Sequence, residues 1–166
     1  MFPAALKDDA AKLLQAMRER ELTLATAESC TGGLIAALLT EIPGSSDVLE
    51  RGFVTYSDEA KVEMLEVPEG VLKEHGAVSE QVARAMAVGA LVNSEADIGV
   101  SVTGIAGPGG GSAAKPVGLV HLAVAQLGTP TLHVELRLGD LGRAAVREKS
   151  IAAALQLVRR ALEAAP

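Results

Sequence analysis

The stretch of residues 26–33 combines side chains capable of covalent chemistry with glycines that let a ligand come close. Its candidate catalytic or binding positions are Glu28, Ser29, Cys30, Thr31, Gly32 and Gly33. Because glycine has no Cβ, backbone N–H groups in such a turn can approach a ligand that a larger residue would keep away. The same residues also suit an ordinary helix N-terminus with Ser29 or Thr31 as the cap. Residue types alone leave both alternatives open.

A serine needs a base before it can attack a carbonyl carbon, and no histidine lies in the candidate stretches. Lys61 can act as that base if burial or a neighbouring cation lowers its pKa from the ordinary value of about 10.4. Tyr56 stands shortly before it in the sequence and could relay the proton or polarise the pair. We therefore predict Ser29, Lys61 and Tyr56 as a catalytic set.

Cys30 is the rival nucleophile. With Glu28 and Lys61 it resembles in kind the Glu-Lys-Cys arrangement of nitrilase-type amidases. Adjacent side chains in a turn point in different directions, however, and a lone cysteine is more often a small buried apolar residue. We therefore favour Ser29 over Cys30.

A second candidate site is the segment 104–112, which has five glycines in its first eight positions and cannot form a regular element. It lacks the Gly-Lys-Ser/Thr ending of a phosphate-binding P-loop and the glycine spacing of a dinucleotide fingerprint. Its backbone N–H groups, with Gly104 and Gly107 as contact positions, can still cradle an anion or an oxyanion, and Lys115 could add charge. The alternative is a surface loop without a ligand.

Arg143 and Arg147 stand one turn apart at the beginning of the last predicted helix. Most arginines in such positions are solvated, although arginine at a helix N-terminus can clamp a phosphate or a carboxylate. Spacing alone leaves both interpretations open.

The composition excludes several classes of function. The net charge is −6, and Phe2, Phe53 and Tyr56 are the only aromatic side chains. Binding of nucleic acid requires a basic footprint, and single strands usually also stack on aromatic side chains. We therefore expect no nucleic-acid partner.

The single cysteine excludes an internal disulfide and a cysteine-rich metal site. His75, His121 and His133 fall on different predicted elements without metal-ligand spacing, so we expect no metal and solvated or core histidines. The charged N-terminal segment is not a signal peptide, and no apolar run approaches the ~20 residues that span a bilayer. We expect a cytoplasmic protein without membrane contact.

Hydrophobic periodicity predicts alternating helices and strands. The predicted helices are 3–20, 34–42, 58–65, 80–94 and 143–163, and the predicted strands are 22–27, 52–56, 98–103, 118–126 and 131–138. A polar loop is expected around Pro68 and Gly70, and Ser57 and Ser79 are expected to cap the helices that follow them.

This order of elements predicts a single α/β domain over residues 1–166, a three-layer α/β/α structure with a mixed sheet of about five strands. The last two strands are close enough to form an antiparallel hairpin. Ligands in open α/β sheets lie outside the carboxyl ends of parallel strands. Three predicted strands end at Ala27, Tyr56 and Thr103, so we expect the polar stretches after them to converge on one site.

Four motifs, in order along the chain, resemble the CinA C-terminal domain family. They are TAESCTGG at 26–33, GFVTYS at 52–57 with Lys61, HGAVS at 75–79, and TGIAGP at 103–108 followed by KPVG at 115–118. The enzymatic members of this family are nicotinamide-mononucleotide deamidases. The match runs over nearly the whole chain, which resembles the stand-alone form of the family.

The resemblance implies hydrolysis of the nicotinamide mononucleotide carboxamide to nicotinate mononucleotide and ammonia, without a metal or other cofactor. It also implies an α/β/α fold with a mixed sheet. Carried over by position, the nucleophile is Ser29, the base Lys61, the assisting tyrosine Tyr56, the hydroxyl of the TGIAGP motif Thr103, and a ligand-binding arginine Arg143. The alternative is a non-catalytic module that binds or senses pyridine nucleotides. A small-molecule nucleotide is the expected partner, and a homodimer is possible.

Overall fold

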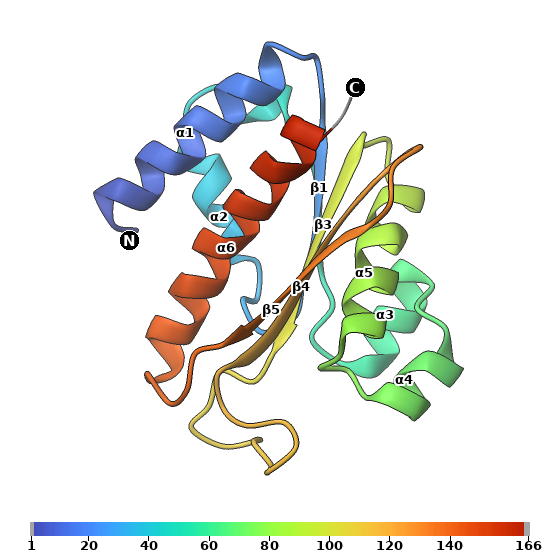
Figure 1. Ribbon diagram of the computed structural model, residues 1–166. Helices are drawn as coiled ribbons and strands as arrows, with labels where there is room; N and C mark the ends of the chain where they lie inside the picture. The colour runs from blue at the N-terminus through green and yellow to red at the C-terminus, as the bar shows by residue number, and fades with distance from the viewer. Residues whose placement is uncertain (1, 165–166) are drawn as a thin grey trace.

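The computed structural model describes residues 2–164 and is built on one five-stranded sheet (Figure 1). The strands are β1 (Leu24–Glu28), β2 (Leu49–Val54), β3 (Ile98–Gly104), β4 (Leu119–Gln126) and β5 (Leu132–Arg137). Their order across the sheet is β2-β1-β3-β4-β5. β1 runs parallel to β2 and β3, whereas β4 is antiparallel to both of its neighbours. The sheet is therefore mixed, with the predicted hairpin at one edge.

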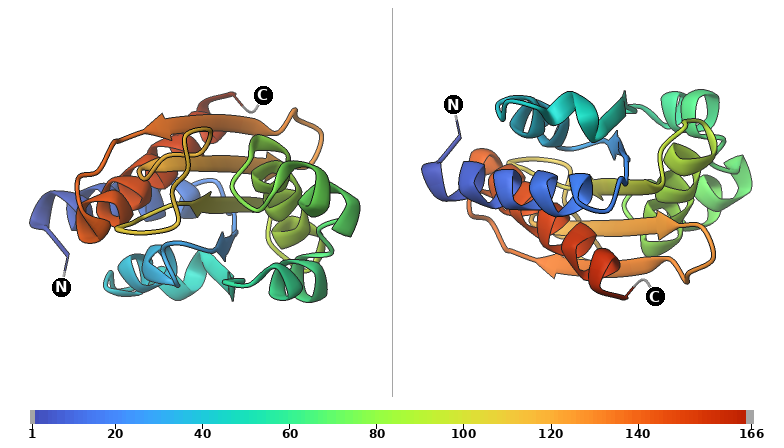
Figure 2. Two further views of the ribbon diagram at one scale, coloured as in Figure 1. Left: turned by 90° about the horizontal axis from the view of Figure 1, so that it is seen from below. Right: turned by 90° about the horizontal axis from the view of Figure 1, so that it is seen from above.

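Helices cover both faces of the sheet, which confirms the predicted three-layer α/β/α class (Figures 1 and 2). One face carries α1 (Ala4–Arg18), α2 (Leu34–Thr40) and α6 (Arg143–Ala164), and the other carries α3 (Asp58–Leu65), α4 (Glu69–His75) and α5 (Glu80–Val92). A short 3₁₀ turn at Ser45–Asp47 precedes β2. Every residue of the interior strand β1 is buried, as expected for a strand covered on both faces.

Two hydrophobic cores lie on either side of the sheet. The larger one joins α1, α2 and α6 to the sheet and is built mainly from Leu, Ile, Val and Ala. The smaller one, under α3, α4 and α5, includes Ala25, Ala27, Phe53 and Met86. The residues at the contact between α5 and the sheet are small. Their small side chains let the helix pack close to the sheet.

The structure corrects two sequence predictions. A helix, α4, occupies the segment expected to be a polar loop; it follows Pro68, and Leu72 is its one buried residue. Seven residues with a single buried position give too short a pattern to show a helical period. The second correction concerns β2, which begins at Leu49 and ends at Val54, so that Tyr56 lies beyond the strand end. Its edge position leaves most of its side chains partly exposed, which hides the strand pattern.

Both predicted serine caps are confirmed. Ser57 accepts a hydrogen bond from the Ala60 N–H at 3.0 Å, and Ser79 accepts one from the Val82 N–H at 3.3 Å. Both serines satisfy donors that a helix N-terminus leaves unpaired. Over residues 2–164, no helix has the combination of length and apolar character that crossing a membrane would need.

Candidate functional site

The loops that follow β1, β2 and β3 meet at the carboxyl ends of these parallel strands, as predicted. Backbone hydrogen bonds continue past the strand ends: the Ser29 N–H donates to the Val102 carbonyl at 3.0 Å, and the Thr55 N–H donates to the Glu28 carbonyl at 2.9 Å. A cavity of about 220 Å³ opens there. It is lined by Ser29, Cys30, Tyr56, Lys61, Ala77, Val78, Thr103, Gly104, Ala106 and Arg143.

Lys61 lies beside Ser29 at the base of this cavity. Its Nζ atom is 3.1 Å from Ser29 Oγ and 2.8 Å from the Thr55 carbonyl oxygen, and the residue is only 1% exposed. Burial lowers the pKa of Lys61 from its ordinary value, because a charged ammonium loses its hydration there; nearby Asp58 opposes the shift. The two side chains come from the turn after β1 and from α3, so the fold creates the pair.

The Glu28 side chain stabilises the turn through hydrogen bonds and does not line the cavity. Its fully buried carboxylate accepts the Thr31 hydroxyl at 2.7 Å and the N–H groups of Ile35 and Ala36, each at 2.9 Å. The first N–H groups of a helix have no partner within the helix, so Glu28 caps α2. We therefore reassign the side chains of Glu28 and Thr31 from substrate binding to support of the Ser29 turn.

The backbone of the turn offers unpaired donors. Gly32 and Gly33 have φ angles of +60° and +96°, which glycine adopts without strain. The Gly32 N–H donates to the Ser29 carbonyl at 3.0 Å. Among residues 2–164, no acceptor pairs with the N–H groups of Thr31 or Gly33, whereas the Cys30 N–H donates to its own thiol. Of these three residues, Cys30 lines the cavity, whereas Thr31 is fully buried and Gly33 lies outside the lining.

Cys30 lines the cavity but lies in a setting that suppresses its reactivity. Burial raises the pKa of its thiol to about 11, with a smaller opposing effect from its own backbone. The nucleophilic form of cysteine is the thiolate, which is scarce near neutral pH at such a pKa. No hydrogen bond joins Cys30 to Lys61 within residues 2–164.

Tyr56 and Arg143 form the rim of the cavity. Tyr56 is 61% exposed, and its hydroxyl accepts a hydrogen bond from Arg143 Nη2 at 3.0 Å. Arg143 Nη1 donates to the Gly107 carbonyl at 3.0 Å and thereby ties α6 to the glycine loop. The predicted relay from Tyr56 to Lys61 or Ser29 is not formed, because the tyrosine hydroxyl pairs with the arginine. Tyr56 is placed to contact a ligand instead.

The remaining predicted positions lie on β3 and the glycine loop. The Thr103 hydroxyl donates to the Ala77 carbonyl at 2.8 Å and so connects β3 to the segment before α5. A Cβ at Gly104 would lie 2.9 Å from the Leu119 carbonyl oxygen, so packing against β4 requires glycine there. The loop projects from the lower end of the sheet in Figure 1, where α6 begins.

Sequence reasoning missed two groups. The first is the contact of Arg147, whose Nη2 donates to the Thr31 carbonyl at 3.0 Å. The second is a histidine pair whose members were expected to be apart: His121 Nδ1 and His133 Nε2 lie 3.0 Å from each other. The two histidines belong to the predicted hairpin, so its register was the signal that could have revealed their contact. Over residues 2–164, no three potential ligand side chains gather closely enough to hold a metal ion.

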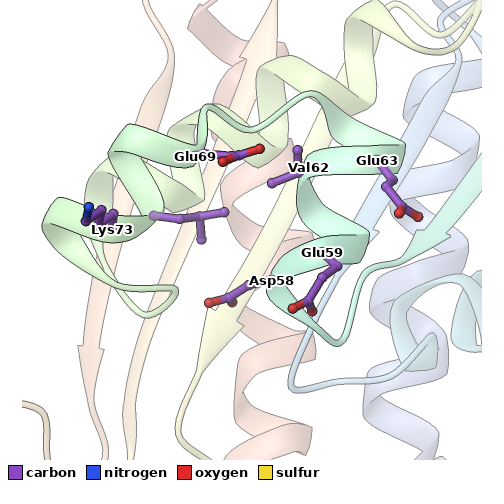
Figure 3. Close-up of a pocket in the computed structure, with 7 residues that line it drawn as sticks. Asp58, Glu59, Val62, Glu63, Glu69 and Lys73 are labelled. Carbon is purple, nitrogen blue, oxygen red and sulfur yellow. The ribbon is translucent and has the colours of Figure 1, made fainter.

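A larger cavity of about 530 Å³ lies between α3 and α4 (Figure 3). Its lining consists of Asp58, Glu59, Val62, Glu63, Glu69, Leu72 and Lys73. It contains four carboxylates but neither a nucleophile nor a buried base. The smaller cavity, which contains the serine–lysine pair, is therefore the candidate active site.

The fold and the site together define a three-layer α/β/α protein with a buried serine–lysine pair at the carboxyl edge of a mixed sheet. The sequence model of the CinA C-terminal domain matches residues 6–162, and the chain belongs to the CinA C-terminal domain family. This confirms the resemblance seen in the four motifs.

Individual relatives agree with this assignment. A CinA-like protein of Akkermansia muciniphila is 56% identical over 132 residues, which cover 80% of this chain and 32% of that protein. The competence/damage inducible protein CihA of Agrobacterium tumefaciens is 51% identical, with a TM-score of 0.95 over 98% of both chains. A CinA superfamily protein of Escherichia coli is 31% identical, with a TM-score of 0.89 over 97% of this chain and 94% of that one. The chain spans about a third of the length of the curated relatives it matches.

Proposed function

We propose that this domain is an amidohydrolase that converts nicotinamide mononucleotide to nicotinate mononucleotide and ammonia. The observation that carries the proposal is the buried Lys61 amine 3.1 Å from Ser29 Oγ, in a cavity rimmed by Arg143. A serine hydroxyl next to a buried amine of lowered pKa is the arrangement that activates a serine without histidine. The substrate comes from the family resemblance in the four motifs.

The chemistry follows from the residues in the cavity. Neutral Lys61 takes the proton from Ser29 as Oγ attacks the carboxamide carbon, and the carbonyl π electrons move to the oxygen. We infer that backbone N–H groups of the turn after Ser29 stabilise this oxyanion, and Cys30 is the residue of that turn that lines the cavity beside Ser29. Such a donor contributes on the order of 3 kcal/mol in well-studied enzymes.

The tetrahedral intermediate then collapses. The carbon–nitrogen bond breaks while the Lys61 ammonium returns its proton to the leaving nitrogen, so ammonia departs and an ester to Ser29 remains. Water, deprotonated by Lys61, attacks that ester, and the Lys61 ammonium returns the proton to Ser29 Oγ as the ester bond breaks. The released acid ionises to the nicotinate carboxylate, and ammonia takes up that proton as ammonium. Protons balance over the two steps, and Lys61 serves as base and acid in turn.

The rim supplies the contacts for the rest of the nucleotide. Arg143 is a permanent cation beside the glycine loop, and it suits a phosphate because a guanidinium can offer paired N–H donors. Tyr56 and Thr103 add hydroxyl groups to the lining of the same cavity. We infer that the nicotinamide ring lies toward Ser29 and the ribose phosphate toward Arg143.

The test is ammonia release from nicotinamide mononucleotide by wild type, Ser29→Ala and Cys30→Ala. We expect release by wild type, loss in Ser29→Ala and substantial retention in Cys30→Ala. Binding of the nucleotide without ammonia release by the wild-type protein would favour a sensing module instead. Full activity in Ser29→Ala together with loss in Cys30→Ala would move the nucleophile to the thiol.

A further inference from the structure

Arg147 contacts the turn that carries the nucleophile, although it comes from the last helix. Its Nη2 donates to the Thr31 carbonyl at 3.0 Å, and a Cβ placed on Gly32 would lie 3.8 Å from the same nitrogen. Its Nε is buried and, among residues 2–164, has no hydrogen-bond partner. The guanidinium thus lies against the backbone of the turn, one helical turn beyond Arg143.

Both polar ends of Thr31 are hydrogen-bonded. Its hydroxyl donates to Glu28 at 2.7 Å, and its carbonyl accepts from Arg147 at 3.0 Å and, in a longer bond, from the Leu34 N–H at 3.3 Å. The Ser29 end of the turn is held separately, because the Gly32 N–H donates to the Ser29 carbonyl. Two glycines with positive φ angles follow Thr31, and glycine restricts the backbone less than other residues. Without the arginine contact, the Thr31 carbonyl would lose its side-chain anchor to α6.

We propose that Arg147 is a positioning residue for the reaction: it holds the Thr31 carbonyl and with it the conformation of the turn, so that Ser29 and the backbone N–H groups beside it keep their places around the developing oxyanion. This inference rests on the proposed serine chemistry. It separates the two arginines of α6 by role, since Arg143 lines the cavity whereas Arg147 does not. Loss of Arg147 should therefore lower kcat, and loss of Arg143 should mainly raise KM.

The experiment compares Arg147→Met, Arg147→Lys and Arg159→Ala with wild type. Methionine keeps an unbranched stem, and lysine can still donate one hydrogen bond to the Thr31 carbonyl. Arg159 is a matched control, because it lies on the same helix and its Nη2 donates to the Asp9 carbonyl at 2.9 Å, away from the cavity. Melting temperature, kcat and KM are measured for each protein.

We expect Arg147→Met to lower kcat about 10- to 100-fold with KM changed less than about threefold, since a misplacement of about 1 Å can cost about 100-fold. Arg147→Lys should recover part of the loss, and Arg159→Ala should keep the wild-type kcat. An unchanged kcat in Arg147→Met, or a rise in KM alone, would overturn the inference. A kcat loss of equal size in Arg159→Ala would also overturn the inference, because it would show that any disturbance of α6 lowers kcat.

A second readout separates this inference from the choice of substrate. A fluorophosphonate probe forms a Ser29 Oγ–phosphorus bond, releases fluoride and develops charge on the phosphoryl oxygen, so its labelling rate needs no nucleotide. Labelling of wild type without ammonia release would refute the substrate and still test Arg147, with a rate about 10- to 100-fold slower expected for Arg147→Met, as for kcat. Ammonia release with equal kcat in wild type and Arg147→Met would refute Arg147 alone. Neither labelling nor release would refute both.

Discussion

Lys61 shows at the scale of one residue how the fold lowers the pKa of an amine. A lysine that is 1% exposed loses hydration, and its pKa falls because the charged form is the one that burial penalises. The Thr55 carbonyl at 2.8 Å holds the amine in place toward Ser29. The amine is therefore held in position, and its neutral form is more populated near neutral pH than that of a lysine in water.

The pH dependence of activity follows from that shift. As base, Lys61 must be neutral, so kcat/KM should fall as pH drops through its lowered pKa, giving an acidic limb below the ordinary value of about 10.4. Lys61→Met should lose about 100- to 10,000-fold in kcat/KM, the usual contribution of a general base. A profile of kcat/KM against pH measures both effects. A wild-type limb centred at or above about pH 10.4 would contradict the role of burial.

Glu28 should affect stability before chemistry. Its carboxylate accepts three hydrogen bonds in a fully buried position, and glutamine of the same shape would point an amide donor at one of those donors. We expect Glu28→Gln to lower the free energy of unfolding by about 2–4 kcal/mol, since hydrogen bonds to a charged group contribute about 1.5–3 kcal/mol each and an unpaired group adds its own cost. Urea denaturation measures the difference.

Glu41→Gln is the matched control for that measurement. Glu41 pairs with Lys7 at 2.9 Å on the surface, where water screens the interaction. Its substitution should leave the urea midpoint nearly unchanged. Equal midpoints for Glu28→Gln and wild type would show that the carboxylate does not hold the start of α2.

At the scale of elements, the crossing of α5 over α3 depends on Gly89. A Cβ at this position would lie 2.0 Å from the Leu65 carbonyl oxygen and 2.8 Å from Leu65 Cβ, so the helices could not keep their separation. Gly70, near the start of α4, has open space around it, because a Cβ placed there would meet no heavy atom within 4 Å. Alanine therefore fits the helix at position 70 and clashes at position 89.

We expect Gly89→Ala to destabilise the protein by about 1–3 kcal/mol, the usual cost of overpacking a core. Gly70→Ala should stabilise it by up to about 1 kcal/mol, because alanine has the higher helix propensity. Thermal or urea unfolding of the two variants checks both signs at once. A stabilising Gly89→Ala would mean that α3 moves away without cost.

At the scale of the whole molecule, the histidine pair joins the hairpin to the helical layer of α5. His121 on β4 and His133 on β5 lie ring to ring, with their nitrogens 3.0 Å apart and ring centroids separated by 5.2 Å. Glu80 and Arg84 of α5 and Glu135 of β5 are the charged neighbours, and Lys115 adds a weaker influence on His121. Burial lowers the pKa of both histidines, and repulsion from His133 lowers that of His121 further.

Unfolding should therefore become easier as pH falls below about 6.5, the ordinary histidine pKa. The unfolded chain takes up protons at that value, whereas the folded pair resists them, so stability is complete above it and declines as pH drops toward the lowered pKa values. Urea denaturation between about pH 5 and pH 8 measures the slope. His133→Gln should reduce this slope of unfolding free energy against pH. His75→Gln should leave the slope unchanged, because His75 lies outside the pair. Equal slopes in all three proteins would contradict this assignment.

The sequence by itself determined the order of most elements and the two serine caps, and it singled out the turn at Ser29 as the candidate site. These features depend on neighbours within a few residues: apolar periodicity for the helices, side-chain oxygens for the caps, and glycines after Ser29 for the turn. Lys61 could also be predicted as the base for Ser29, because no histidine lies in the candidate stretches. The short helix α4 escaped detection because one buried residue gives no period.

Only the tertiary structure decided which side chains meet. Arg147 and Thr31 are 116 positions apart, Tyr56 and Arg143 are 87 apart, and the histidine contact depends on hairpin register. Glu28 was predicted to bind substrate, and only the structure shows that α2 places two N–H groups, beside the Thr31 hydroxyl, against its carboxylate. Such contacts depend on how separate elements pack, because small shifts in register or helix position change the partners of every side chain.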